Sequence, residues 1–103
     1  MSDFNINRHG NQCQVALTGD LTATIVPPLQ TALKTALQGD PEEVTFDLAK
    51  TAMLDSSGIG LLIATLNTVS RWRGRLRVIN TSGEILQLLQ SMRLVTRLNV
   101  SGR

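Results

Sequence analysis

The stretch VTFDLAKTAMLDSSGIGLLI, residues 44–63, decides the fold class. Its first five residues alternate around Phe46 and include β-branched side chains, a pattern that is typical of a strand. A loop over residues 49–55 follows. From residue 57 to residue 73 a helix is indicated by apolar residues at helical spacing, namely Ile59, Leu62, Ile63, Leu66 and Val69, with Gly74 placed as its C′ residue. A strand that leads through a loop into a helix predicts an α/β fold.

The two ends of the chain add strands and a helix. Residues 3–7 and 12–17 alternate polar and apolar on either side of a turn, which predicts a β-hairpin. Residues 76–79 form another expected strand, and Ser82 is placed to cap a helix with an acidic first turn. The apolar stripe expected on that helix is Ile85, Leu88, Leu89 and Met92. Residues 98–100 predict a short last strand.

Between hairpin and central strand the sequence predicts one more helix. Pro27 and Pro28 fit its first turn, and Thr22 or Thr24 is expected to cap it. Its apolar stripe is Leu29, Ala32, Leu33, Ala36 and Leu37. The order of elements is ββαβαβα with a final strand, which predicts one α/β domain over residues 1–103. We expect a mixed β-sheet with an N-terminal hairpin at one side and helices covering the sheet.

The composition argues against a zinc protein, a secreted protein and a membrane-spanning protein. The apolar fraction is 42% with three aromatic residues, so the core must come from Leu, Ile, Val and Ala. A single cysteine, Cys13, and a single histidine, His9, cannot make a structural zinc site, and we expect no metal and no cofactor. Cys13 is expected to be a core residue. Residues 1–5 lack the basic start and apolar run of a signal peptide, and no stretch is apolar enough to span a membrane. We therefore expect a cytoplasmic protein without membrane insertion.

The charges are unevenly distributed. Residues 1–55 carry three basic and seven acidic side chains, whereas residues 56–103 carry seven arginines and one glutamate. The densest cluster, RWRGRLR at residues 71–77, is compatible with an anionic partner. It has little aromatic interleaving for stacking bases, and cations are favoured at a helix C-terminus. We therefore interpret it as a solvated surface and expect no direct nucleic-acid binding, with Trp72 as a packing residue.

The segment Asp55-Ser56-Ser57-Gly58 lies where the second helix begins. Amide groups at a helix N-terminus lack intrahelical partners and attract a phosphate. Phosphorylation of a serine there would add roughly 1.5 to 2 negative charges beside Asp55. The simpler interpretation, a serine that only caps the helix, stays open from the residues alone.

The chain resembles the STAS domain family, and within it the bacterial anti-sigma factor antagonists. The resemblance is carried by VALTGDL at residues 15–21, by VTFDL at residues 44–48, and above all by LDSSGIGLL at residues 54–62. Residues 76–80 and the helix after them fall where the family has its next strand and helix. Thr22 departs from the family pattern, which usually has an aspartate there.

This resemblance implies a partner-switching protein that acts in transcription regulation and signal transduction. Ser56 is the implied phospho-acceptor of a serine kinase that is also an anti-sigma factor, and a serine phosphatase resets the switch. The unphosphorylated form binds the kinase and releases the sigma factor. The residues implied in partner binding are Asp55, Ser57, Gly58, Gly60, Asp20 and Thr22.

Rival chemistry fits the sequence poorly, and we expect no enzyme. A hydrolase nucleophile elbow needs glycine two positions before the serine, where this chain has Leu54. A phospho-accepting Asp55 would need an acidic pair for Mg²⁺ and a suitably placed lysine, and the nucleotide-binding glycine motifs are absent. The alternative of another class is a constitutive subunit of a larger complex, in lipid or anion transport or a signalling scaffold, in which Ser56 is a plain helix cap.

Overall fold

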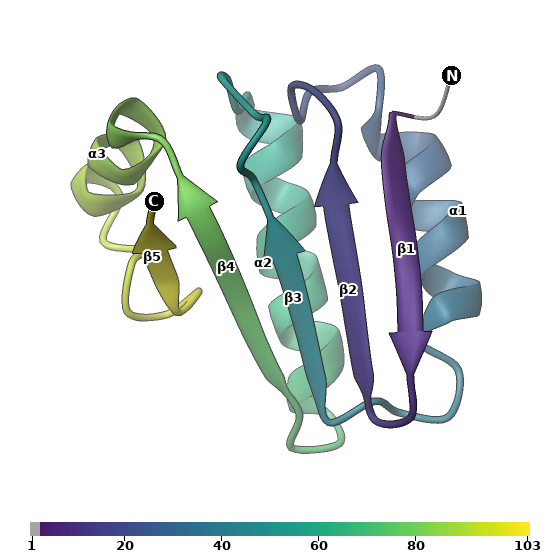
Figure 1. Ribbon diagram of the computed structural model, residues 1–103. Coiled ribbons are helices and arrows are strands. Elements are labelled where there is room, and N and C mark those ends of the chain that lie inside the picture. Colours follow the sequence, from purple (N-terminus) through teal and green to yellow (C-terminus); the bar gives the residue numbers. More distant parts are fainter. Residues whose placement is uncertain (1–2) are drawn as a thin grey trace.

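The computed structural model describes residues 3–103 and contains one five-stranded sheet and three helices. The strands are β1 (Phe4–His9), β2 (Gln12–Leu17), β3 (Glu43–Asp47), β4 (Arg75–Thr81) and β5 (Val100–Gly102). The helices are α1 (Val26–Ala36), α2 (Ser56–Ser70) and α3 (Gly83–Ser91). The sheet order is β1-β2-β3-β4-β5, with β1 antiparallel to β2 and all other pairs parallel. The expected mixed α/β fold with an N-terminal hairpin is confirmed (Figure 1).

The sheet order explains why α1 and α2 share one face. Each parallel crossover moves one strand further in the same direction, and right-handed crossovers of that kind place their helices on the same side. Figure 1 shows α1 and α2 behind the sheet, while α3 lies beside β4 and β5. The other face has no helix over its central strands, and β2 and β3 present polar residues such as Gln14 and Glu43 there.

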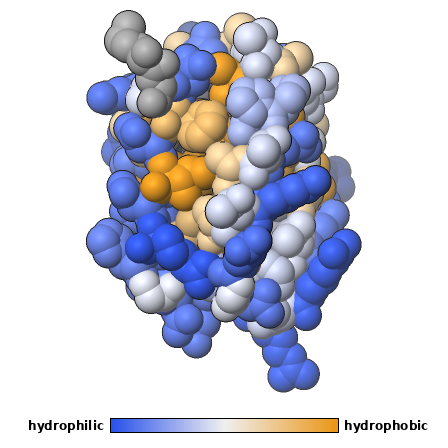
Figure 2. All heavy atoms as spheres, turned by 90° about the vertical axis from the view of Figure 1, so that its right-hand side faces the viewer, coloured by the Kyte–Doolittle hydropathy of each residue, from blue (hydrophilic) through white to orange (hydrophobic). Residues whose placement is uncertain are grey.

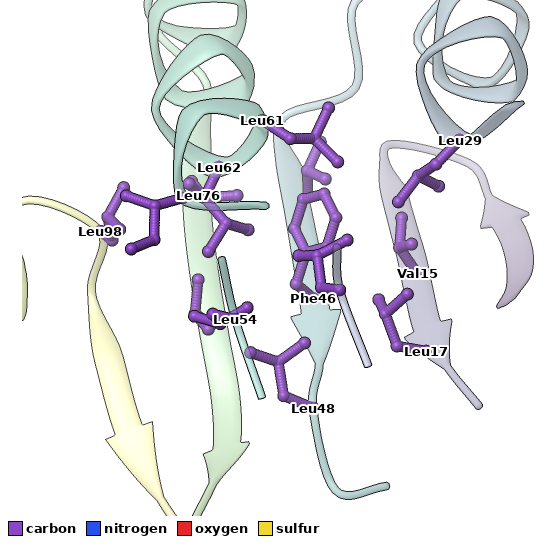
Figure 3. Close-up of a cluster of buried hydrophobic side chains, with 14 of the residues drawn as sticks. Val15, Leu17, Leu29, Phe46, Leu48, Leu54, Leu61, Leu62, Leu76 and Leu98 are labelled. Atoms are coloured by element: carbon purple, nitrogen blue, oxygen red, sulfur yellow. The ribbon is translucent and has the colours of Figure 1, made fainter. Parts of the chain in front are cut away.

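The core lies between the sheet and the helices. Alternate residues of the strands point into it, including Cys13, Val15, Val44 and Phe46, all fully buried. Figure 3 shows how leucines from the helices and loops close around Phe46. On the side formed by β1 and α1, a limited apolar area is surrounded by hydrophilic residues (Figure 2). Cys13 is a core residue as predicted, because it is fully buried. That burial raises the pKa of its thiol, against the lowering effect of Arg8.

The predicted cap of α1 is wrong. The helix begins after Ile25 and no side chain caps it, so neither Thr22 nor Thr24 has that role. A capping side chain accepts from the second or third amide of the helix. In α1 these positions are Pro27 and Pro28, which have no N–H to donate. The backbone carbonyl of Thr22 instead accepts hydrogen bonds from the amides of Ile25 and Val26.

The end of α2 also differs from expectation. The residue with the left-handed conformation is Arg73, at φ 63°, and not Gly74. Gly74 donates its amide to the carbonyl of Val69 at 2.7 Å. A Cβ on Gly74 would lie 2.9 Å from Nε1 of Trp72, so glycine is required here by crowding. Trp72 is half-buried and donates its Nε1 to the carbonyl of Pro41 at 2.8 Å, in agreement with a packing role.

The C-terminal region follows the prediction in part. Ser82 caps α3 by accepting from the amide of Ile85, as expected. Of the predicted stripe, Ile85 and Leu89 are buried, but Leu88 and Met92 are exposed, because α3 packs on β4 and β5 at the side of the sheet and buries a narrow face. The last strand lies two residues later than predicted, since Asn99 adopts a left-handed turn conformation.

Candidate functional site

Two loops meet at the carboxyl ends of β2 and β3. They are residues 18–25, before α1, and residues 48–55, before α2. Leu21 pairs with Leu54 as an isolated parallel bridge, and its amide donates to the carbonyl of Met53 at 3.1 Å. The Thr51 hydroxyl donates to the carbonyl of Gly19 at 2.8 Å. These bonds join the loops into one surface from which α2 begins.

Asp55 fixes the start of α2 to the neighbouring loop. Its extended backbone makes it the N-cap, and one carboxylate oxygen accepts from the amide of Gly58 at 2.9 Å. The other oxygen accepts from the amide of Ala23 at 2.9 Å. These backbone hydrogen bonds, that from Gly58 first, hold the pKa of Asp55 below its ordinary value. The carboxylate is therefore ionised at neutral pH and bound to amides of both loops.

Gly58 permits the close approach of helix and loop. An added Cβ would lie 2.3 Å from the carbonyl oxygen of Leu21 and 3.0 Å from its Cγ. Backbone oxygen cannot move aside as a flexible side chain can. Gly60, two residues further along α2, is exposed, and a Cβ added to it would have nothing within 4 Å.

Ser56 is the first helical residue and not the cap. The capping role that either serine could have filled belongs to Asp55. Ser56 is exposed, whereas Ser57 is half-buried. Within residues 3–103, the Ser56 hydroxyl makes no hydrogen bond to another protein group. The interpretation of Ser56 as a plain helix cap is therefore wrong.

Asp20 and Thr22 lie in the first of the two loops. One carboxylate oxygen of Asp20 accepts from the amides of Ala52 and Met53, at 3.0 Å each. Thr22 is half-buried, and its carbonyl supports the turn into α1. The structure thus brings the predicted loop residues onto the same end of the sheet as the start of α2.

Met53 and Ala23 also belong to this surface, and the sequence pattern does not predict either of them. The side chain of Met53 is 53% exposed, although its amide and carbonyl are both held by the first loop. An apolar residue in a loop gives no sign of its exposure, since Leu54 beside it is buried. The role of Ala23 is played by its amide, which no side-chain pattern could reveal.

Other kinds of site find no support among the described residues. Within residues 3–103, no group of three or more His, Cys, Asp or Glu side chains is placed to hold a metal ion. His9 lies exposed at the end of β1, beside the hairpin turn and away from Ser56. No helix in the described part of the chain is long and apolar enough to cross a membrane.

Comparison with known proteins identifies the family. A family model described as "Mlab, STAS domain" matches residues 4–100. The chain belongs to the STAS domain family. This STAS domain is 29% identical over 80 residues to the anti-sigma-B factor antagonist of Staphylococcus epidermidis, which covers 78% of this chain and 74% of that protein.

Solved structures share the fold of this STAS domain. The anti-sigma factor antagonist SpoIIAA, in its unphosphorylated form, superposes with a TM-score of 0.73 at 20% identity, over 93% of this chain and 97% of that one. SpoIIAA from Bacillus in its phosphorylated form superposes with a TM-score of 0.78 at 20% identity, over 97% of this chain and 90% of that one. An anti-sigma factor antagonist from Mycobacterium paratuberculosis superposes with a TM-score of 0.82 at 18% identity, over 97% of this chain and 85% of that one. At these identities the likeness concerns the fold.

Proposed function

We propose that this STAS domain is a partner-switching protein, an anti-sigma factor antagonist whose docking is controlled by phosphorylation of Ser56. In the unphosphorylated state it binds a serine kinase that is also an anti-sigma factor. Phosphorylation ends that binding, and a serine phosphatase restores it. The curated relative named as an anti-sigma-B factor antagonist supports this class of function. The domain acts by binding and carries no catalytic residue of its own.

The exposed Ser56 hydroxyl is the observation that carries the proposal. Asp55 caps the helix, so the fold needs no hydroxyl at Ser56. The side chain is exposed and makes no hydrogen bond to another group within the described residues. Small neighbours, Ser57 and Gly60 among them, let a kinase active site approach the backbone. A hydroxyl that the fold does not use is available for modification.

The charges at the site explain how phosphate would act as a switch. The Asp55 carboxylate already occupies the amides of Gly58 and Ala23. A phosphate on the adjacent residue adds roughly 1.5 to 2 negative charges. A partner surface that accepts the neutral serine would then have to desolvate this charge beside Asp55, and docking weakens.

The surface that docks consists of the two joined loops and the first turn of α2. Asp20 orients the backbone at Ala52 and Met53, so that the Met53 side chain stands in solvent beside the α2 start. Methionine is enriched in protein interfaces because its flexible thioether adapts to a partner's pocket. We assign Met53 as an apolar anchor of the docking surface.

Binding by two Ser56 variants, one neutral and one charged, tests the proposal. Full-length protein, Ser56→Ala and Ser56→Asp are used to recover partners from the native cells, and a recovered kinase is then titrated in purified form. Ser56→Ala should bind and resist phosphorylation by that kinase with ATP, whereas Ser56→Asp should bind at least tenfold more weakly. Asn67→Asp, which adds the same charge at an exposed position of α2, is the matched control and should bind normally.

The competing function is a constitutive subunit of a larger complex. It predicts a stable complex that Ser56→Asp and Ser56→Ala leave equally intact, with no kinase among its members. Equal binding by both Ser56 variants therefore rejects the switch in favour of the constitutive subunit.

A further inference from the structure

A groove separates α1 and α2 on the helical side of the sheet. Its volume is about 680 Å³, within the range of roughly 300–1,000 Å³ that holds small ligands. The groove extends from Pro27 to Gln38, just past the end of α1, and from Leu61 to Trp72, just past the end of α2. Its helical part is roughly 15 Å long at 1.5 Å per residue. Leu33, Leu61 and Thr65 are its most deeply buried lining residues.

The lining is more apolar than its residue types suggest. The hydroxyls of Thr31, Thr65 and Thr68 donate to carbonyls of their own helices, at 3.2, 2.8 and 2.9 Å. The indole N–H of Trp72 donates to the carbonyl of Pro41. These four residues line the groove with their donors already in use. What they offer a ligand is therefore methyl and ring surface.

One charged group lines the groove. It is Lys34, in the last turn of α1 and exposed, and within residues 3–103 no acidic side chain lines the groove. Among the residues that the structure describes, Lys34 forms no ion pair. A groove with a mainly apolar surface, two glutamine amides (Gln30 and Gln38), one cation and no anion is complementary to a molecule with a hydrocarbon chain and one acidic head group.

We propose that the groove between α1 and α2 binds a free fatty acid, with its chain between the helices and its carboxylate beside Lys34. This site is independent of the docking surface at Ser56.

Fluorescence of the single tryptophan tests the site directly. Trp72 lines the groove and the chain has no tyrosine, so the emission reports on this place alone. Decanoate, added to the purified protein below its micelle concentration, should shift the emission to shorter wavelength with saturation. Decanol, which has the same chain without the charge, should bind about two- to fivefold more weakly, the range expected for a partly exposed ion pair.

Matched variants locate the ligand. Lys34→Gln should weaken decanoate binding by the same two- to fivefold and remove the preference over decanol, whereas Lys50→Gln, at the other lysine, should change neither. Ala64→Phe places a ring in the groove and should abolish the saturable shift. Asn67→Phe adds the same ring at an exposed position of α2 outside the groove and should leave it intact.

Three results would overturn this assignment. The first is the absence of a saturable shift with decanoate, which would show that the groove does not hold a fatty acid and would leave it as a surface for a partner's helix. The second is a shift that appears with phosphatidylglycerol vesicles alone, which would indicate a membrane surface as the ligand. The third is equal binding of decanoate by Ala64→Phe and wild type.

Discussion

Replacing Gly58 by alanine should destabilise the fold, although alanine is the better helix former. The added Cβ would lie 2.3 Å from the carbonyl oxygen of Leu21, a contact that only a shift of the α2 start can relieve. That shift strains the hydrogen bond between Asp55 and Ala23 and the bridge between Leu21 and Leu54. Overpacking costs about 1–3 kcal/mol and a weakened hydrogen bond costs about 1 kcal/mol. The gain in helix propensity is about 1 kcal/mol, so we expect a net loss of about 2 kcal/mol.

Gly60→Ala is the matched control, because nothing lies within 4 Å of its Cβ. It should stabilise the protein by about 0.5–1 kcal/mol. Thermal unfolding followed by circular dichroism separates the two, since 1 kcal/mol shifts the Tm of a domain of this size by about 4–8 °C. We expect a fall of roughly 8–16 °C for Gly58→Ala and a rise of a few degrees for Gly60→Ala. Equal Tm values for the two variants would refute the close approach of α2 to Leu21.

Three further variants test other parts of the structure. The pKa of Asp55 is lowered in the folded protein, so its carboxylate stabilises the fold above the ordinary pKa of aspartate. This contribution disappears as the pH falls through the pKa of the folded state. Between neutral and strongly acidic pH, the Tm of Asp55→Asn should therefore fall by less than the Tm of the wild type. Ser82→Ala should cost about 1 kcal/mol in urea unfolding, while Thr24→Ala, at a position that caps nothing, should change stability by less than about 0.5 kcal/mol; equal losses would contradict the capping assignment. Met53→Gln should weaken binding of the partner kinase about tenfold in calorimetric titration. The control is Met92→Gln, an equally polar substitution at the C-cap of α3, where the methionine is 46% exposed, and it should bind normally. Equal affinities of the two variants would remove Met53 from the docking surface.

The sequence predicts well those features, such as strand bounds and helix caps, that depend only on neighbouring residues in the chain. β2 begins and ends where the alternation does, and Ser82 caps α3 as its position before an acidic first turn indicates. The parallel pairing of the later strands and the place of the hairpin at one side also follow from the alternation of strands and helices. These features require no knowledge of distant neighbours.

The cap of α2 could not be assigned from the sequence. Asp55, Ser56 and Ser57 are all good capping residues, so the local pattern leaves the choice open. The amide of Ala23, 32 residues away in sequence, provides a second partner that only an aspartate at position 55 uses here. The distinction between Asp55 as cap and Ser56 as a free hydroxyl therefore comes from tertiary structure.

Surface features depend on tertiary structure in the same way. The exposure of Met53 is set by two hydrogen bonds to another loop: its amide donates to the Asp20 carboxylate, and its carbonyl accepts from the Leu21 amide. The groove depends on the spacing of α1 and α2 across the sheet, which no helical stripe encodes. The stripe of α3 was predicted too wide because the helix lies at the side of the sheet and covers less of it than α1 and α2.

Phosphopeptide mapping of the protein from its native cells tests the central claim most directly. Trypsin should release residues 51–71 as one peptide that contains Ser56, Ser57, Ser70 and three threonines, and fragmentation assigns any phosphate to one of these residues. The account predicts phosphate on Ser56, present under some growth conditions and absent under others, with the kinase bound in the second case. An unmodified peptide under every condition, from protein that is always recovered in one stable complex, would contradict it.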